Sequence, residues 1–126
     1  MNKKILIIDD DPGIVGVLGK FFEEAGAMVL AVDTCEKGLA AIKQNQYDVA
    51  IIDLILPDRS GLDLAKEIHS LPQPHPLPIV LTNSTNVADI AGALDSDVTM
   101  FIQKADHDPK DVVTMVMKYI TEKSQK

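Results

Sequence analysis

Residues 48–61 read DVAIIDLILPDRSG, and this stretch predicts how the rest of the chain is arranged. Residues 49–52 form a continuous apolar run, which is typical of a central parallel strand that is covered on both faces. Asp53 follows this run directly, and Pro57 and Gly61 indicate a loop before the next helical pattern. Ligands of open α/β sheets bind beyond the carboxyl ends of the strands. Asp53 is therefore a candidate functional residue, although a lone aspartate at this place is also typical of a helix cap or a turn.

Apolar runs of similar length alternate with segments of helical spacing along the whole chain. The further runs predict strands at residues 5–8, 28–32, 79–81 and 99–103. Helical spacing predicts helices near residues 12–25, 35–45, 62–71, 87–94 and 109–123. A strand and a helix repeated five times predict an α/β fold with a five-stranded parallel sheet and helices on both faces. Residues 1–126 are expected to form one domain, because this length suffices for one core and not for two.

Local signals predict several helix ends and one connection. Asp11 and Asp108 each precede a proline, the pattern of a helix N-cap followed by proline at the first helical position. Residues 33–36 resemble a capping box, and Gly26 is a typical helix end. The proline-rich residues 71–78 are expected to form a stiff surface connection.

Two of the predicted helices carry patterns with two interpretations each. Each of Gly13, Gly16 and Gly19 lowers the stability of the predicted helix by about 1 kcal/mol relative to alanine. We favour close approach of this helix to the sheet or a neighbour as their reason, and a flat docking face for a partner helix is the alternative. The last helix has a wide apolar arc, formed by Val112, Val113, Met115, Val116, Met117, Tyr119 and Ile120. This arc fits a generous core face and a dimer or partner surface equally well.

Composition and charge exclude several classes of function. A net charge of −7 and a pI near 4.7 argue against direct binding of nucleic acid or of anionic membranes. The single cysteine, Cys35, excludes an internal disulfide and suits a reducing compartment. No apolar run approaches the roughly 18 residues of a membrane span, and the N-terminus lacks a signal-peptide pattern. We therefore expect a cytoplasmic protein.

Acidic, hydroxyl and amine side chains follow four of the predicted strands. Residues 9–11 are aspartates after the first strand, and Asp53, Thr82 and Lys104 follow the third, fourth and fifth. All these strand ends lie along one edge of a parallel sheet. Several carboxylates close together favour a cation between them, and a set of oxygen ligands suits Mg²⁺. Such a site favours phosphoryl transfer, in which an aspartate can accept the phosphoryl group as an acyl phosphate.

Asp9, Asp10, Asp53 with Pro57 and Gly61, Thr82 and Lys104 together resemble one known family over the whole chain. The chain is similar to the receiver domain of two-component response regulators. The resemblance implies a doubly wound sheet of flavodoxin-like order. It also implies that Asp53 accepts a phosphoryl group from a histidine kinase or a histidine phosphotransfer protein. The protein would then be a signalling protein, not an enzyme, and would catalyse only its own phosphorylation and slow dephosphorylation.

The resemblance implies a metal site around the acceptor. Asp10, Asp53 and the backbone carbonyl of Ile55 would bind Mg²⁺ (or Mn²⁺), and Asp9 would act through water. Asp11 is not part of that set, and we interpret it as the helix cap.

The resemblance also implies a switch and an output surface. Lys104 would pair with the phosphoryl oxygens, Thr82 would move towards them, and Phe101 would occupy the aromatic switch position. The fourth helix, fifth strand and fifth helix would carry the signal to a downstream protein partner, and a homodimer through this surface is possible. Because no effector segment follows residue 126, signalling is expected to pass through protein contacts.

Three places depart from the family pattern. Asn83 stands after Thr82, where a small residue is usual, and would narrow phosphoryl access or donate a hydrogen bond. Ala105 stands after Lys104, where proline is usual, so a trans bond is expected there. Residues 97–98 read Asp-Val where Gly-Ala is common.

Two further residues bear on the lifetime of the phosphorylated form. In the family, the side chains at the positions of Ile55 and Ser84 flank the path of the hydrolytic water. An apolar Ile55 cannot orient a water, and Ser84 carries one weakly. We therefore predict that the phosphorylated protein loses its phosphate slowly.

Three rival functions are weighed against this one. A haloacid-dehalogenase-like phosphatase would use Asp9 and Asp11, but residues 12–14 do not follow its motif. A flavodoxin-type flavin binder needs a hydroxyl-rich phosphate loop where this chain has acids. The third alternative is a receiver-like module that only binds partners and is never phosphorylated. The complete set of acids with Thr82 and Lys104 argues against it, whereas the departures at Asn83 and Ala105 favour it.

Overall fold

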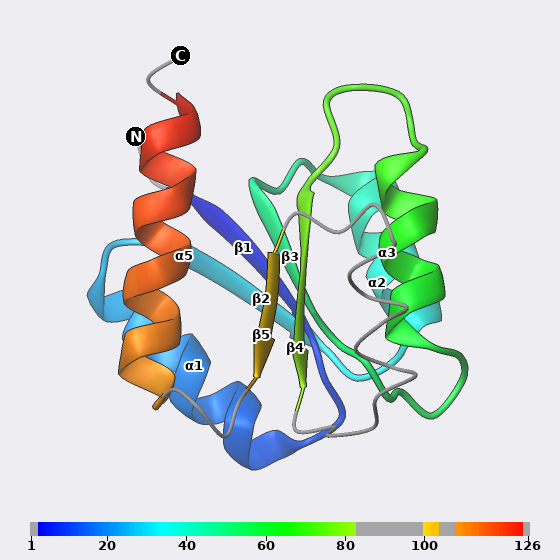
Figure 1. Ribbon diagram of the computed structural model, residues 1–126. Helices are drawn as coiled ribbons and strands as arrows, with labels where there is room; N and C mark the ends of the chain where they lie inside the picture. The colour runs from blue at the N-terminus through cyan, green and yellow to red at the C-terminus, as the bar shows by residue number, and fades with distance from the viewer. Residues whose placement is uncertain (1–2, 83–99, 104–107, 125–126) are drawn as a thin grey trace.

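The computed structural model describes residues 3–82, 100–103 and 108–124 (Figure 1). The elements in chain order are β1 (Lys4–Ile8), α1 (Pro12–Glu24), β2 (Met28–Val32), α2 (Cys35–Gln44), β3 (Val49–Asp53), α3 (Gly61–His69), β4 (Leu77–Thr82), β5 (Met100–Gln103) and α5 (Pro109–Ser124). The helix predicted near residues 87–94 lies outside the described residues. None of the helices in the described part of the chain has the length and apolar character that a membrane span requires.

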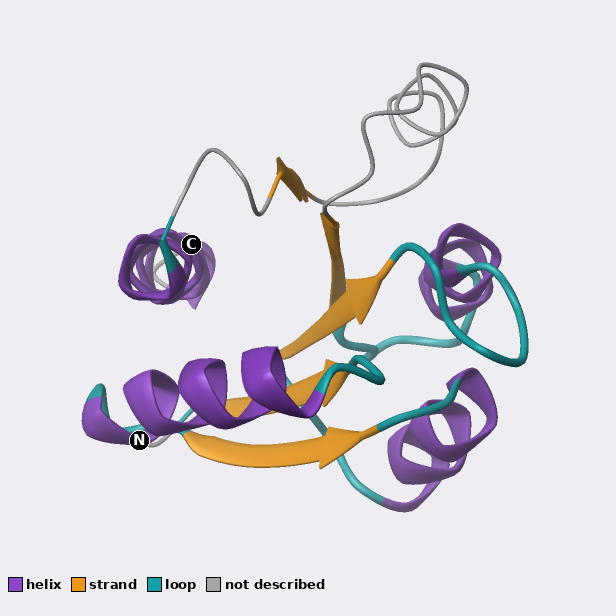
Figure 2. Ribbon diagram, turned by 90° about the horizontal axis from the view of Figure 1, so that it is seen from below, coloured by secondary structure: helices purple, strands orange, loops and turns teal. Residues whose placement is uncertain are grey.

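The five strands form one all-parallel sheet in the order β2-β1-β3-β4-β5. Helices α1 and α5 cover one face of this sheet, and α2 and α3 cover the other (Figures 1 and 2). The order is that of a doubly wound, flavodoxin-like sheet. The predicted fold class is therefore confirmed.

The central strands are apolar throughout because both of their faces are buried. Side chains alternate across a strand, so Ile5 and Ile7 join the core under α1 and α5. Leu6 and Ile8 join the second core under α2 and α3. β3 divides in the same way between the two cores, which is why residues 49–52 show no polar alternation.

β4 begins earlier than predicted and includes Pro78. The N–H of Leu77 donates to the carbonyl of Asp48 on the β3 side. Because N–H groups alternate sides along a strand, the nitrogen of Pro78 faces the β5 side, where pairing begins only at Ile79. Proline therefore removes no hydrogen bond to β5 at this point.

Most helix ends follow the predicted signals. The Asp11 carboxylate accepts from Gly13 N–H at 3.0 Å, and the Asp108 carboxylate accepts from Asp111 N–H at 2.9 Å. Gly26 follows α1 with a φ of 93°, as expected of a left-handed helix end. The capping box predicted at residues 33–36 is wrong. Thr34 is the N-cap, and its hydroxyl accepts from the N–H of Lys37. A capping box needs a glutamate or glutamine at this third helical position, and Lys37 is neither.

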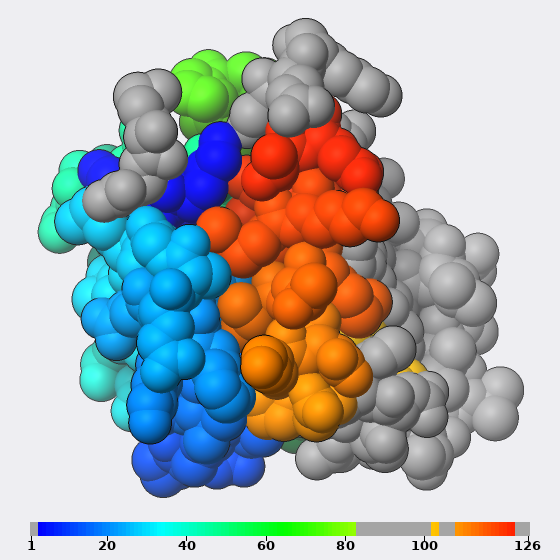
Figure 3. Space-filling view, turned by 90° about the vertical axis from the view of Figure 1, so that its left-hand side faces the viewer, coloured from blue at the N-terminus to red at the C-terminus, as the bar shows by residue number. Residues whose placement is uncertain are grey.

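The structure bears on both helix patterns. A Cβ atom on Gly16 would meet nothing within 4 Å, so close approach does not explain this glycine. The docking-face alternative stays a prediction. On α5, Met115 and Met117 pack against the core that includes Val112 and Val116, which favours the core-face interpretation of the wide arc. Figure 3 shows α5 (orange to red) lying beside α1 (blue) on this face of the molecule.

Candidate functional site

Three aspartate carboxylates meet at the carboxyl ends of β1 and β3. One oxygen from each of Asp9, Asp10 and Asp53 lies within 4.8 Å of the others. The two strands are neighbours, and Ile8 pairs with Ile52, so the residues after them emerge side by side. The sequence predicted these three residues as a group, and the structure brings them together.

The three carboxylates differ in burial and in support. Asp9 is buried with 4% of its surface exposed, Asp53 is half-buried, and Asp10 is exposed. The N–H of Asp9 donates to the carbonyl of Val32 at 3.0 Å, and one Asp9 carboxylate oxygen accepts from Asp11 N–H at 2.9 Å. The buried member is thus fixed by the backbone, while the exposed member faces the solvent.

Asp11 stands apart from this group. Its carboxylate caps α1, and it is not among the carboxylates that the structure brings together in the described chain. The interpretation of Asp11 as a helix cap is confirmed. The rival phosphatase needs Asp11 as a second catalytic carboxylate, so this geometry does not favour it.

A short loop, residues 54–60, joins Asp53 to α3, and we call it the acceptor loop. Leu54 and Leu56 are buried in the core under α2 and α3, whereas the side chain of Ile55 is 64% exposed. The loop closes on itself, because Gly61 N–H donates to the Leu54 carbonyl at 2.8 Å and Ile55 pairs with Ser60. Ile55 therefore presents its side chain outward from a loop anchored on both sides of it.

Gly61 allows α3 to begin directly against the backbone of Asp53. A Cβ atom at this position would overlap the backbone carbonyl oxygen of Asp53 and crowd Ile52. The Ser60 hydroxyl caps α3 by accepting from Leu62 N–H at 3.1 Å. Gly61, which the sequence marked as a loop signal and as part of the family resemblance, is thus also required sterically at this position.

Asp58 joins the acceptor loop to α2 and was not predicted. Its two carboxylate oxygens accept from the N–H groups of Cys35 and Glu36, each at 3.0 Å. These bonds, that of Cys35 above all, hold the pKa of the Asp58 carboxyl below its ordinary value. Burial, followed by the charge of Asp58, raises the pKa of the Cys35 thiol to about 12. No local sequence signal links the two segments, because they lie more than 20 residues apart.

The remaining predicted residues lie near the neighbouring strand ends or outside the described chain. Thr82 ends β4 and is buried, one position beyond the residue that pairs with Asp53. Phe101 lies in β5, and its backbone pairs with that of Val80 in β4. The side chain of Phe101 is outside the described part of the chain. Asn83, Ser84, Asp97, Val98, Lys104 and Ala105 also lie outside the described residues.

The acidic cluster fits a hard divalent cation. Its donors are carboxylate oxygens only, the type of ligand that Mg²⁺ prefers. Like charges this close repel each other, and a cation between them removes the repulsion. A hollow of about 460 Å³ opens beside Asp9 and Asp10, on the side of the cluster that faces α1 and β2.

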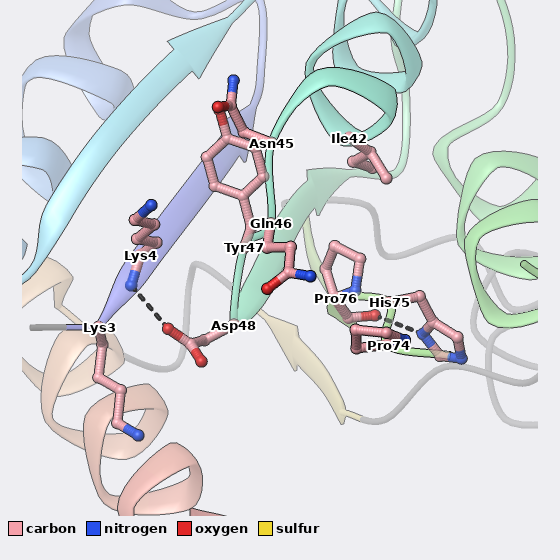
Figure 4. A pocket seen from close by; sticks show the side chains of 10 residues that line it. All are labelled: Lys3, Lys4, Ile42, Asn45, Gln46, Tyr47, Asp48, Pro74, His75 and Pro76. Atoms are coloured by element: carbon pink, nitrogen blue, oxygen red, sulfur yellow. Dashed lines mark hydrogen bonds between the residues drawn. The ribbon is translucent and has the colours of Figure 1, made fainter. Parts of the chain in front are cut away.

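The opposite edge of the sheet holds a second cavity of about 450 Å³, which contains none of the predicted site residues. Figure 4 shows the side chains that line it. The Asp48 carboxylate accepts from Lys4 N–H there at 2.8 Å, and His75 lies in a proline-rich segment on the far side. This hydrogen bond ties together the beginnings of β1 and β3, so we assign it a structural role.

Fold and site together define a flavodoxin-like α/β protein with an acidic centre at the carboxyl ends of its parallel strands. The family model described as "Response regulator receiver domain" matches residues 5–117. The chain therefore belongs to the receiver domain family of response regulators, whose members are the phosphoacceptor domains of two-component systems.

Individual relatives agree with this assignment. The chain is 27% identical over 117 residues to "DNA-binding response regulator MtrA" of Mycolicibacterium smegmatis, covering 92% of this chain and 50% of that protein. It is 30% identical over 100 residues to "Transcriptional regulatory protein GlrR" of Escherichia coli, covering 79% of this chain and 22% of that protein. The chain thus spans half or less of these two curated relatives.

The fold is also shared with solved receiver domains. A CheY-like response regulator receiver domain protein from Methanospirillum hungatei superimposes with a TM-score of 0.88 at 27% sequence identity. That match covers 99% of this chain and 98% of the other.

Proposed function

We propose that Asp53 accepts a phosphoryl group from a phosphohistidine on a histidine kinase or a phosphotransfer protein. The proposal depends on one observation above all, the meeting of Asp9, Asp10 and Asp53 in a chain of the receiver family. A carboxylate oxygen of Asp53 attacks phosphorus and the P–N bond to the donor histidine breaks. The electron pair of that bond stays on the imidazole, which then takes up a proton. The product is an acyl phosphate on Asp53.

In this proposal the acidic cluster holds Mg²⁺ (or Mn²⁺). Asp10, Asp53 and the backbone carbonyl of Ile55 are the proposed ligands, and Asp9 acts through a bound water. When bound, the ion supplies positive charge that offsets the negative charge of the cluster and of the transferring group. Asp9 is suited to a supporting part, because the backbone N–H of Asp11 already holds its carboxylate in place.

The same proposal assigns roles to the neighbouring strand ends. Lys104 pairs with the phosphoryl oxygens, and Thr82 moves towards the phosphoryl group, accompanied by Phe101. The surface of the fourth helix, β5 and α5 then binds a downstream protein or a second copy of the chain. The position of Thr82 at the end of β4, beside the strand that carries Asp53, supports its part in this switch.

The protein would act as a signalling domain in the cytoplasm and catalyse only its own phosphorylation and dephosphorylation. Its net charge of −7 supports protein partners over direct contact with nucleic acid. The named DNA-binding and transcriptional roles belong to relatives of which this chain covers half or less.

Intact mass after incubation with a small phosphodonor and Mg²⁺ tests the proposal. We expect a single phosphoryl adduct on the wild type, none on Asp53→Ala, and none on the wild type when a chelator removes the metal. Asp63→Asn is the matched control, because it removes an exposed acid in the first turn of α3 and should leave the adduct intact. An unmodified wild type would favour a module that only binds partners. Multiple turnover that requires Asp9 but not Asp53 would favour the phosphatase.

A further inference from the structure

The carboxylate of Asp58 joins the acceptor loop to the N-terminus of α2. The first N–H groups of a helix have no partner within the helix. In α2, Thr34 satisfies only Lys37 N–H, at 3.1 Å. The N–H groups of Cys35 and Glu36 instead donate to the two carboxylate oxygens of Asp58. Asp58 lies 23 residues after Cys35 and 22 residues after Glu36 in the chain. A negative charge at this end of a helix is also favourable to its dipole.

Further contacts hold the same loop from both sides. The thiol of Cys35, which is fully buried, donates to the backbone carbonyl of Arg59 at 3.8 Å. The Arg59 guanidinium pairs with Glu67 of α3 at 2.9 Å. Figure 2 shows α2 and α3 side by side on this face of the sheet. The loop thus contacts both helices, and the two hydrogen bonds of Asp58 are its shortest links to α2.

This attachment bears on the metal site through Ile55. The backbone carbonyl proposed as a ligand lies on the acceptor loop, three residues before Asp58. A backbone ligand has no side-chain freedom, so its position depends on the conformation of the whole loop. Leu54 and Leu56 anchor the first half of the loop in the core, and the hydrogen bonds of Asp58 fix the second half.

We infer that Asp58 is a positioning residue of the acidic site, which holds the acceptor loop in its metal-binding conformation by capping α2. The inference rests on the proposed Mg²⁺ site and deepens it. Asp58 itself touches neither the metal nor the phosphoryl group. Residues that orient metal ligands without contacting the metal commonly have large effects on affinity.

Mg²⁺ titration followed by backbone amide chemical shifts tests the inference. For Asp58→Ala we expect Mg²⁺ affinity to fall by about tenfold. The Mg²⁺ affinity of Asp58→Asn should lie between those of the wild type and Asp58→Ala, because its carboxamide keeps only one acceptor oxygen. Labelling of Cys35 by a thiol reagent, measured without metal, should be faster in Asp58→Ala than in the wild type, since the loop that covers the thiol is released.

Two controls separate positioning from plain destabilisation and from loss of charge. Thr34→Ala removes a different cap bond of the same helix, and Asp33→Asn removes an acid that lines the same hollow as Asp9 and Asp10. Both should keep the wild-type affinity for Mg²⁺. The inference is overturned if Asp58→Ala binds Mg²⁺ as the wild type does, or if either control weakens binding equally. A wild type that binds no Mg²⁺ would instead overturn the proposed metal site itself.

Discussion

Residue 61 and the carbonyl oxygen of Asp53 lie so close that a Cβ atom on residue 61 would overlap this oxygen. The obstructing atom belongs to the backbone of β3 and cannot rotate away. We predict that Gly61→Ala destabilises the protein by about 1–3 kcal/mol, the usual cost of overpacking a buried site. Urea unfolding measures this loss. The variant should also be phosphorylated more slowly than the wild type, because α3 must shift relative to Asp53.

Gly16 provides the matched substitution at a position without this constraint. It lies inside α1, and an added Cβ would meet nothing within 4 Å. We predict that Gly16→Ala stabilises the protein by about 0.5–1 kcal/mol, because alanine restricts the unfolded chain and favours the helix. Urea unfolding should place the two variants on opposite sides of the wild type. A stable Gly61→Ala would show that the start of α3 adapts at little cost.

The sequence predicted the parts of the fold that depend on local pattern. β1 and β3 were found because burial on both faces makes them continuously apolar, and Asp11 was found as a cap because its partner lies two residues away. The acidic cluster was predicted because parallel strands bring their carboxyl ends to one edge. Asp58 was missed because its partners lie in another helix, and that contact exists only after folding. Pro78 was predicted to lie in a connection, whereas it lies in β4. A proline fits there only because pairing with β5 begins one residue later, at Ile79, and the sequence does not show this.

The pKa of Asp58 predicts an acid limit for the cap of α2. Hydrogen bonds from Cys35 N–H and Glu36 N–H hold this pKa below its ordinary value of 3.8. The folded carboxyl therefore stays ionised where the unfolded one takes up a proton. The resulting stabilisation is fully present above pH 3.8 and is lost as the pH falls through the lowered pKa.

Urea unfolding at a series of acidic pH values should show this dependence. Below pH 3.8 the wild type should lose stability more steeply than Asp58→Asn, which has no charge to lose at this position. The amide shifts of Cys35 and Glu36 should titrate together in the wild type. Parallel stability curves for the two proteins would contradict the assignment.

Cys35 predicts a loss of stability at alkaline pH, because its pKa is raised whereas that of Asp58 is lowered. Burial raises the pKa of its thiol from 9.0 to about 12, so the native thiol stays protonated at mildly alkaline pH. Reaction with a thiol reagent at pH 8 should be slow in the native protein and fast in urea, because the thiolate is the reactive form. Stability should also decline above pH 9, where the unfolded thiol ionises first. Rapid native labelling would show that the loop opens readily, and a Cys35→Ser variant should lack the alkaline decline.

The exposed side chain of Ile55 predicts how long the phosphorylated state lasts. This side chain projects from the acceptor loop two residues past Asp53, and its exposed fraction is 64%. A hydrocarbon cannot accept or donate a hydrogen bond, so it cannot orient a water for attack on an acyl phosphate. We predict that Ile55→Asn shortens the lifetime of the phosphorylated protein several-fold, as followed by intact mass after removal of the phosphodonor. Ile55→Val keeps the apolar character and should leave the lifetime close to that of the wild type. An equal or longer lifetime in Ile55→Asn would mean that water reaches the acyl phosphate without help from this position, and slow hydrolysis would then need another cause.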